Sequence, residues 1–302
     1  MSPLVSVLHD AIKIATPFLL AAMGGLFTEH AGILNIALEG LMLIAAFFSV
    51  FSAGMTGSIG IGLLAGVLSS MFLALIFAYT SLNLRANIFI AGIATNLLAV
   101  ALTALLASAL LGHRGVYRFE SFPSLPLIPQ TAGLGPVGDI LTGHNVLVYL
   151  SWLLIAGTSL VLYRTPFGLR MRASGYAPRT VRTTGLNPRR YQLLAILISG
   201  LTCGLSGAFL SLNLEAWVPN VTAGRGWIAL VIIYLGYKKP LGLFLASLFF
   251  GLAESLSNFS QGFLSLPSDI ILAFPYIMSM LALLIYSIWE HRKRHAKRQV
   301  SS

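Results

Sequence analysis

Long apolar segments separated by short polar connections dominate this chain of 302 residues. A helix needs roughly 20 mainly apolar residues to cross a hydrocarbon core of about 30 Å. The segment 227–237 is too short to cross alone, which predicts a broken or re-entrant helix. The sequence therefore predicts an all-α, polytopic membrane protein with about 8–9 transmembrane helices. The candidate spans are Ile12–Phe27, Leu38–Ala53, Ile59–Tyr79, Ile88–Leu111, Val146–Tyr163, Tyr191–Leu212, Trp227–Tyr237, Leu241–Leu256 and Ile270–Ile288.

Composition excludes a soluble enzyme. Only 9% of the residues are charged and 57% are hydrophobic, whereas a soluble domain has about 25% charged residues. The single cysteine, Cys203, lies in an apolar run and rules out a disulfide framework. The six histidines are scattered, and His291 and His295, four residues apart, lie in a basic tail. We expect no metal site and no cofactor bound by this chain.

Basic residues are concentrated in three short polar segments. Lysine and arginine number 19 against 9 acids, and 14 of the bases lie in 164–190, 238–239 and 291–302. Cytoplasmic loops of membrane proteins carry such an excess of bases, so this clustering favours membrane orientation over nucleic-acid binding. It predicts a bacterial-type plasma (inner) membrane protein with these segments and the C-terminus in the cytoplasm, and with an external N-terminus.

Enzymatic motifs are missing from the sequence. There is no GxxxxGK[ST] phosphate loop, no Ser/His/Asp set and no paired-carboxylate arrangement. The loop 113–144 has four prolines and favours an extended surface segment, either a docking surface or a connection. A secondary transporter would show a repeat and acids near the membrane midplane, and among the spans only Glu254 stands out. We therefore expect a transport subunit that catalyses no bond chemistry.

The segment 29–40, between the first two spans, places polar residues within or close to the membrane. Charged groups there are costly and usually face protein or a watery path. Glu29 and His30 fit a position at the membrane interface. Glu39 either caps or orients the following helix or lines a pathway, and Asn35 belongs to the same run.

Three segments carry a resemblance to a known family. The runs 22–42 (AMGGLFTEHAGILNIALEGLM), 168–175 (GLRMRASG) with 185–188 (GLNP), and 218–230 (VPNVTAGRGWIAL) occur in that order. They resemble the permease subunits of ABC importers for nucleosides and simple sugars, with a fold like that of type II ABC importers. Two positions depart from the family pattern: Tyr176-Ala177 replaces an acidic residue and Asn, and Lys238-Lys239-Pro240 replaces an aromatic-Asn-Pro sequence.

This resemblance implies a single permease domain over 1–302. Nucleosides are the expected substrate, with a simple sugar or another small solute as the alternative. It implies three partners: an ATP-binding subunit that uses ATP, a second and different permease, and an extracytoplasmic substrate-binding protein. In this family the cytoplasmic loop, here 164–190, holds a coupling helix that contacts the ATPase.

The coupling loop also has a physical interpretation. Pro178 can begin a helix capped near Ser174 or Gly175, and Gly185 can end it in a left-handed conformation. Such a two-turn helix needs a partner surface, which is either an ATPase or anionic lipid headgroups. The expected coupling residues are Arg179, Val181, Arg182, Thr183 and Gly185.

Further polar and aromatic residues in or beside the spans are candidates for the substrate pathway. Asn96 either joins helices or lines a polar route. Phe89 offers a ring for stacking on a base, and Asn220 lies in the third family-like segment. Arg225, between two glycines, either shapes the outer mouth of the pathway or extends to the membrane interface.

Overall fold

The computed structural model describes residues 2–113, 115–120, 122–129, 135–261 and residues 277, 278, 280, 281 and 284. Seven of the helices within these residues are long and apolar enough to cross a membrane. They are α1 (Pro3–His30), α2 (Leu38–Thr56), α3 (Ile59–Ala78) with its π-helical end η1 (Tyr79–Asn83), α4 (Ile88–Leu111), α6 (Val146–Arg164), α9 (Pro188–Leu214) and α11 (Pro240–Ser260). The shorter helices are α5 (Gly135–Leu141), α7 (Pro166–Tyr176), α8 (Pro178–Thr183) and α10 (Arg225–Leu235).

These helices coincide with the first eight predicted spans, and α10 confirms the predicted short helix. With 11 residues and a rise of 1.5 Å per residue, α10 is about 16 Å long, roughly half of a hydrocarbon core. Helix starts follow the sequence signals, since Asn145, Thr165 and Asn187 each accept a hydrogen bond at the start of a helix. The predicted span 270–288 and the tail 291–302 lie outside the described residues, apart from the five isolated positions.

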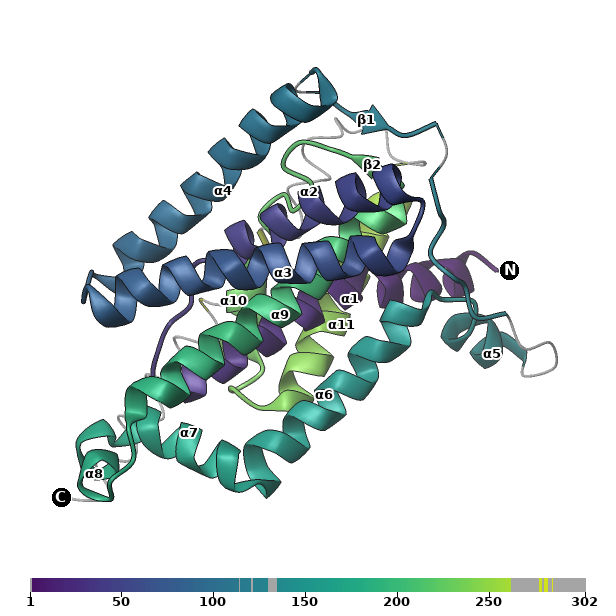
Figure 1. Cartoon of the computed structure of the whole chain (residues 1–302). Helices are drawn as coiled ribbons and strands as arrows, with labels where there is room; N and C mark the ends of the chain where they lie inside the picture. Colours follow the sequence, from purple (N-terminus) through teal and green to yellow (C-terminus); the bar gives the residue numbers. More distant parts are fainter. Residues whose placement is uncertain are drawn as a thin grey trace.

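Helix α1 forms the centre of the bundle and packs against α9, α10 and α11, while α2 packs against α3 and α9 (Figure 1). In the most apolar window of α1, 89% of the residues are buried, compared with 28% in α4. Helix α4 is thus the peripheral one, and most of its apolar surface faces outward.

Small residues let the central helices approach closely. Ser206 in α9 donates a hydrogen bond of 2.7 Å to the carbonyl of Pro17 in α1. A methyl group on Gly204 would lie 2.8 Å from the Cα of Val67 in α3, so only glycine fits there. Helix α9 thus uses small residues for close packing, as membrane helices commonly do.

The loop 113–144 is fixed to the bundle at the end where α9 finishes. Strand β1 (Tyr117–Arg118) pairs antiparallel with β2 (Ala216–Trp217), with Tyr117 opposite Trp217. Trp217 is buried against Phe47, with 5.0 Å between the ring centroids. At least this part of the loop is therefore a structural connection.

Candidate functional site

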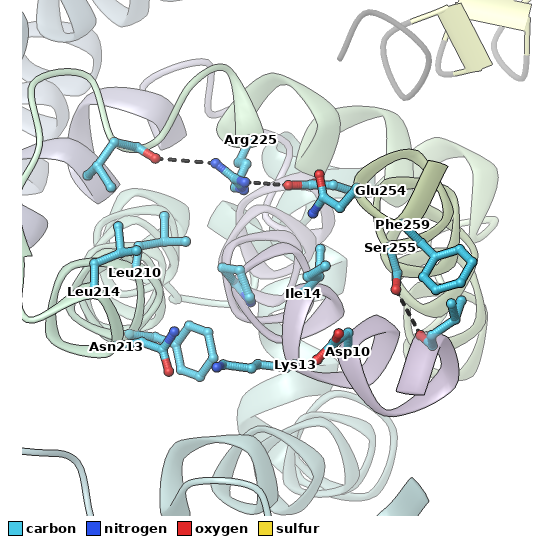
Figure 2. Close-up of a pocket in the computed structure, with 15 residues that line it drawn as sticks. Asp10, Lys13, Ile14, Leu210, Asn213, Leu214, Arg225, Glu254, Ser255 and Phe259 are labelled. Atoms are coloured by element: carbon cyan, nitrogen blue, oxygen red, sulfur yellow. Dashed lines mark hydrogen bonds and ion pairs between the residues drawn. The ribbon is translucent and has the colours of Figure 1, made fainter. Parts of the chain in front are cut away.

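A polar hollow of about 470 Å³ opens between α1, α9, α10 and α11 (Figure 2). It lies at the end of the bundle that holds the N-terminus of α1, the C-terminus of α9 and the end of α11. Apolar side chains, among them Phe209 and Phe259, complete its wall. The polar residues that line it are Asp10, Lys13, Asn213, Arg225, Glu254, Ser255 and Asn258.

Two of the lining residues, Arg225 and Glu254, form an ion pair in the wall of this hollow. The Nη2 atom of Arg225, at the start of α10, contacts Oε1 of Glu254 in α11, and both side chains are largely buried. Arg225 Nη1 also donates a hydrogen bond of 3.2 Å to the carbonyl of Val221. Removing one partner would leave the other charge largely buried without a partner, which is destabilising. The pair therefore fixes α10 to α11 at the hollow.

Glu39 holds the N-terminus of the same short helix. Its carboxylate accepts hydrogen bonds from the backbone N–H of Gly224, at 2.7 Å, and of Gly226, at 2.6 Å. The N-terminal N–H groups of a helix have no partners within the helix and carry partial positive charge. Glu39 thus caps α10 rather than its own helix. It does not line the hollow itself, but it holds the helix that carries Arg225.

Two buried asparagines fix the connection between α1 and α2. Asn96 in α4 accepts a hydrogen bond of 2.8 Å from the N–H of Gly40 and donates one of 2.9 Å to the carbonyl of Ile36. Asn35 donates one of 2.8 Å to the hydroxyl of Ser199 in α9. Both side chains satisfy irregular backbone or join helices, which supports their structural interpretation.

The remaining pathway candidates are dispersed. Phe89 lies in the first turn of α4, is exposed and does not line the hollow. Asn220 is exposed in the α9–α10 connection and has a positive φ of 54°. Of the six predicted pathway residues, only Arg225 lines the hollow.

Several lining residues were not among the sequence-based candidates. Asp10 and Lys13 are three residues apart on α1, and Asn213 and Asn258 are polar residues near the ends of apolar helices. Polar residues near helix ends are common at membrane interfaces, so the pattern alone does not separate them from ordinary interfacial groups. The sequence does show Glu254 as an isolated acid within a span, but it does not show that Arg225 is its partner.

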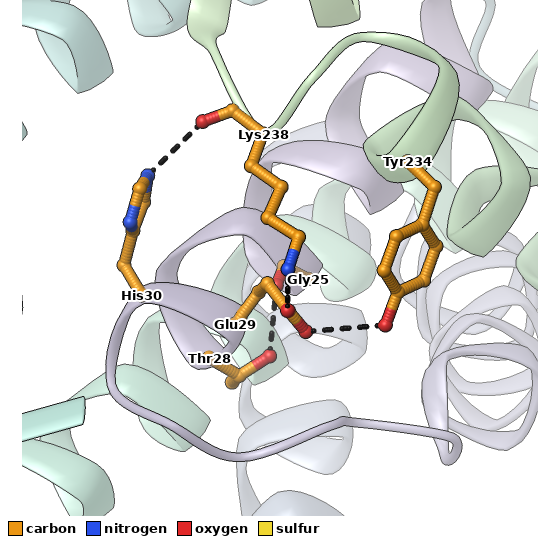
Figure 3. A network of polar contacts seen from close by, with 6 residues as sticks. All are labelled: Gly25, Thr28, Glu29, His30, Tyr234 and Lys238. Atoms are coloured by element: carbon orange, nitrogen blue, oxygen red, sulfur yellow. Dashed lines mark hydrogen bonds and ion pairs between the residues drawn. The ribbon is translucent and has the colours of Figure 1, made fainter. Parts of the chain in front are cut away.

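At the opposite end of the bundle, a polar network joins α1 to the α10–α11 connection (Figure 3). Lys238 Nζ lies 2.6 Å from Oε1 of Glu29, and the Tyr234 hydroxyl lies 3.4 Å from Oε2 of the same carboxylate. The ring Nε2 of His30 lies 3.1 Å from the carbonyl oxygen of Lys238. Glu29 and His30, which the sequence predicts at the membrane interface, therefore anchor the C-terminal end of α10.

The coupling loop 164–190 folds into α7 and α8 beside this network. Gly185 has a φ of 81° and follows α8, as predicted. The predicted cap at Ser174 or Gly175 is wrong, because both residues lie inside α7 and Ala177 precedes α8 without a side-chain cap. Pro178 disfavours a helical conformation at Ala177, which has φ −139° and ψ 68°, so the break between α7 and α8 lies there, after both predicted cap residues.

The coupling residues divide between two faces of α8. Val181 is buried, whereas Arg179, Arg182 and Thr183 are exposed. Tyr176, just before α8, is 95% exposed. Helix α8 therefore packs on the bundle through Val181 and presents cationic and hydroxyl groups outward.

Gly175 brings α7 into direct contact with the α1–α2 connection. A methyl group there would lie 2.6 Å from the backbone nitrogen of Gly32. Since the neighbouring atoms are backbone atoms, they have little room to move. The coupling loop and the end of α1 are consequently in rigid contact.

Comparison with known proteins gives one family and several relatives. The family profile described as the permease component of branched-chain amino acid transport systems matches residues 8–285. The chain is 33% identical to a guanosine ABC transporter permease protein of Bacillus subtilis over 89% of this chain and 88% of the relative.

Two further relatives have similar coverage. The chain is 32% identical to a putative glucose ABC transporter permease protein of Haloferax volcanii, over 89% of this chain and 82% of the relative. It is 29% identical to a nucleoside ABC transporter permease protein of Lactococcus lactis, over 93% and 92%. No solved structure matches.

Proposed function

Because this chain belongs to the family of permease components of branched-chain amino acid transport systems, we propose that it forms the nucleoside pathway of an ATP-driven ABC importer. The observation that carries the substrate class is the likeness to two nucleoside permeases along almost their whole length. A simple sugar is the second candidate, favoured by the 32% identity to the putative glucose permease.

The hollow between α1, α9, α10 and α11 is the proposed entrance for substrate. Its volume of about 470 Å³ lies in the range of small-molecule sites. Its polar groups include donors and acceptors suited to ribose hydroxyls, such as the amides of Asn213 and Asn258, and Phe209 and Phe259 supply aromatic surface for a base. Together with Arg225, these residues are our pathway candidates in place of Glu39, Asn35, Asn96, Phe89 and Asn220.

The coupling loop is the proposed contact with a separate ATPase. The chain has no phosphate-loop motif of its own, so ATP binds to the partner. Movement of α7 is passed to the α1–α2 connection through Gly175 and Gly32, and Lys238 links the end of α1 to α10. Helix α10 in turn carries Arg225 into the hollow, which gives a continuous route of contacts from the coupling loop to the substrate entrance.

The assembly that we propose has two permeases, this chain and a related but different one, with two ATPase subunits on the cytoplasmic side. An extracytoplasmic binding protein delivers substrate to the end that holds the hollow. The basic segments 164–190 and 238–239 then face the cytoplasm of a bacterial-type inner membrane, which agrees with the usual excess of bases in cytoplasmic loops.

Reconstitution tests this function. We expect uptake of radiolabelled guanosine or adenosine into proteoliposomes only when the two permeases, the ATPase, ATP and the binding protein are all present. Glucose added in excess should not compete if nucleosides are the substrate, whereas competition would favour the sugar alternative. Uptake by this chain alone, driven by a proton or sodium gradient, would show that it is a secondary transporter.

A further inference from the structure

An apolar groove lies between α6 and α11 on the outer surface of the bundle, away from the polar hollow. Its volume is about 360 Å³. Figure 1 shows α6 beside the lower part of α11, where the chain turns from α10 into α11. The groove is lined by Trp152, Ile155, Ala156 and Ser159 of α6 and by Pro240, Leu241 and Phe244 of α11.

The surface on both sides of the groove is strongly apolar and exposed. Leu153 and Leu160 on α6 are 69% and 60% exposed, and Leu241 and Leu245 on α11 are 71% and 58% exposed. In a membrane-spanning chain, such a surface faces hydrocarbon. A crevice that opens on it is accessible to an acyl chain from the surrounding bilayer.

The groove continues toward the end of α6 that leads into the coupling loop. A second hollow, of about 430 Å³, shares Ala156 and Ser159 with the groove and extends to Tyr163 and Arg164. Two cations stand at this end, Arg164 from α6 and Lys239 directly before α11. Both side chains are exposed, and neither makes a hydrogen bond or ion pair with the described part of the chain.

The first turn of α11 adds to the positive potential. Lys239 is its N-cap residue, and the Lys239 side chain makes no capping hydrogen bond. Helix N-termini attract anions for this reason. The guanidinium of Arg172 lies 4.9 Å from the ring centroid of Tyr163, and its buried Nε has no hydrogen-bond partner among the residues that the structure describes. The acid near this end, Glu29, is already paired with Lys238.

We propose that this groove binds one anionic phospholipid of the cytoplasmic leaflet. An acyl chain fills the space between α6 and α11, and the phosphate lies against Arg164, Lys239 and the first turn of α11. Basic pockets beside membrane helices bind anionic headgroups in this way. A zwitterionic lipid carries the same phosphate together with a cationic amine, so its net charge is zero and it offsets the two cations less well. The site therefore favours anionic lipids.

A lipid in this position contacts elements that support the coupling loop. Tyr163 packs against both Arg172 of α7 and His30 of α1, the latter with 6.1 Å between the ring centroids. The bound lipid therefore stabilises the arrangement of α6, α7 and α11 from outside the transport pathway. This inference goes beyond the proposed function, and its test does not require transport.

The test is native mass spectrometry of the complete complex, purified in detergent after incubation with phosphatidylglycerol or phosphatidylcholine. We expect one strongly retained phosphatidylglycerol per copy of this chain, and about tenfold weaker retention of phosphatidylcholine. The double variant Arg164→Gln/Lys239→Gln should lower phosphatidylglycerol retention about tenfold, because it removes the headgroup contacts. Ala156→Trp should lower it similarly by filling the groove. The matched control, Arg189→Gln/Arg190→Gln, removes two exposed cations at the same end and should leave retention unchanged.

Photolabelling of the unaltered complex gives an independent measurement. Phosphatidylglycerol with a diazirine on one acyl chain should label the peptide that contains 152–163. Equal retention of the two lipids, unchanged retention in both groove variants, or labelling spread evenly over the outer helices would overturn the proposal. Crosslinking of Ser159→Cys, in a Cys203→Ser background, to the second permease would also overturn it, since the groove would then be a subunit interface. Displacement of the lipid by soluble glycerol phosphate would show that the acyl chain contributes nothing.

Discussion

Replacing Glu39 by glutamine tests whether a side chain of α2 holds α10 in place. The carboxylate accepts hydrogen bonds of 2.7 and 2.6 Å from the N–H groups of Gly224 and Gly226. Hydrogen bonds to charged groups contribute about 1.5–3 kcal/mol each, and neutral ones about 0.5–1.5 kcal/mol. Glutamine keeps one acceptor and turns an amide NH₂ toward the other donor. One charge-assisted bond is therefore lost and the other becomes neutral, which together cost about 3 kcal/mol.

A loss of this size raises the equilibrium constant for local opening of α10 on the order of a hundredfold, since about 1.4 kcal/mol is a factor of ten in an equilibrium constant. We expect amide hydrogen exchange in 224–228 to accelerate by that factor in nanodiscs. ATP-driven uptake should fall, while membrane insertion and complex assembly remain. Glu215→Gln is the matched control, because this exposed acid lies outside the cap.

Two outcomes would contradict this reasoning in different ways. Unchanged exchange together with full uptake would show that the cap contributes little. Unchanged exchange with lost uptake would show that Glu39 acts on the substrate, as a pathway residue would. Gly226→Ala offers a second perturbation, because its methyl group would lie 2.5 Å from the backbone nitrogen of Glu39. It should accelerate the same amides without changing any charge.

Three other predictions follow from the coupling loop and the loop before α6. Val181→Pro should break α8 and uncouple ATP hydrolysis from uptake. Arg182→Ala should have a milder effect, since exposed ion pairs contribute only about 0–1 kcal/mol. Equal effects of the two variants, measured as ATPase activity and uptake, would refute this prediction. Gly175→Ala should lower the melting temperature and uptake through overpacking, at a cost of about 1–3 kcal/mol, while Gly157→Ala, which meets open space, should not. Burial lowers the pKa of His144 in the folded protein below its ordinary value of 6.5. The folded state therefore loses stability as the pH falls from 6.5 toward this lowered pKa, because the unfolded chain takes up the proton more readily. Melting curves from pH 7.5 to 5.5 should show this loss, and His144→Gln should reduce it.

The helical segments were predictable because membrane insertion depends on local composition. A run of apolar side chains favours hydrocarbon wherever it occurs in the chain, so the first eight predicted segments, the short α10 among them, appear at the predicted places. Gly185 was predictable for a similar reason, since a left-handed residue after a helix favours glycine. The cap of α8 was not, because a favourable N-cap residue does not reveal whether the preceding helix already includes it.

The sequence by itself thus determined the long apolar helices, the short α10, their order and the family of this chain. Only the tertiary structure decided which polar group meets which partner. Glu39 and Gly224 are 185 residues apart, and nothing in the segment around either residue specifies the other. Arg225 likewise meets Glu254 only because α10 and α11 pack side by side. Local composition fixes what enters the membrane, whereas the site depends on contacts between distant segments, since a buried polar group must find its partner wherever the packing of helices places one.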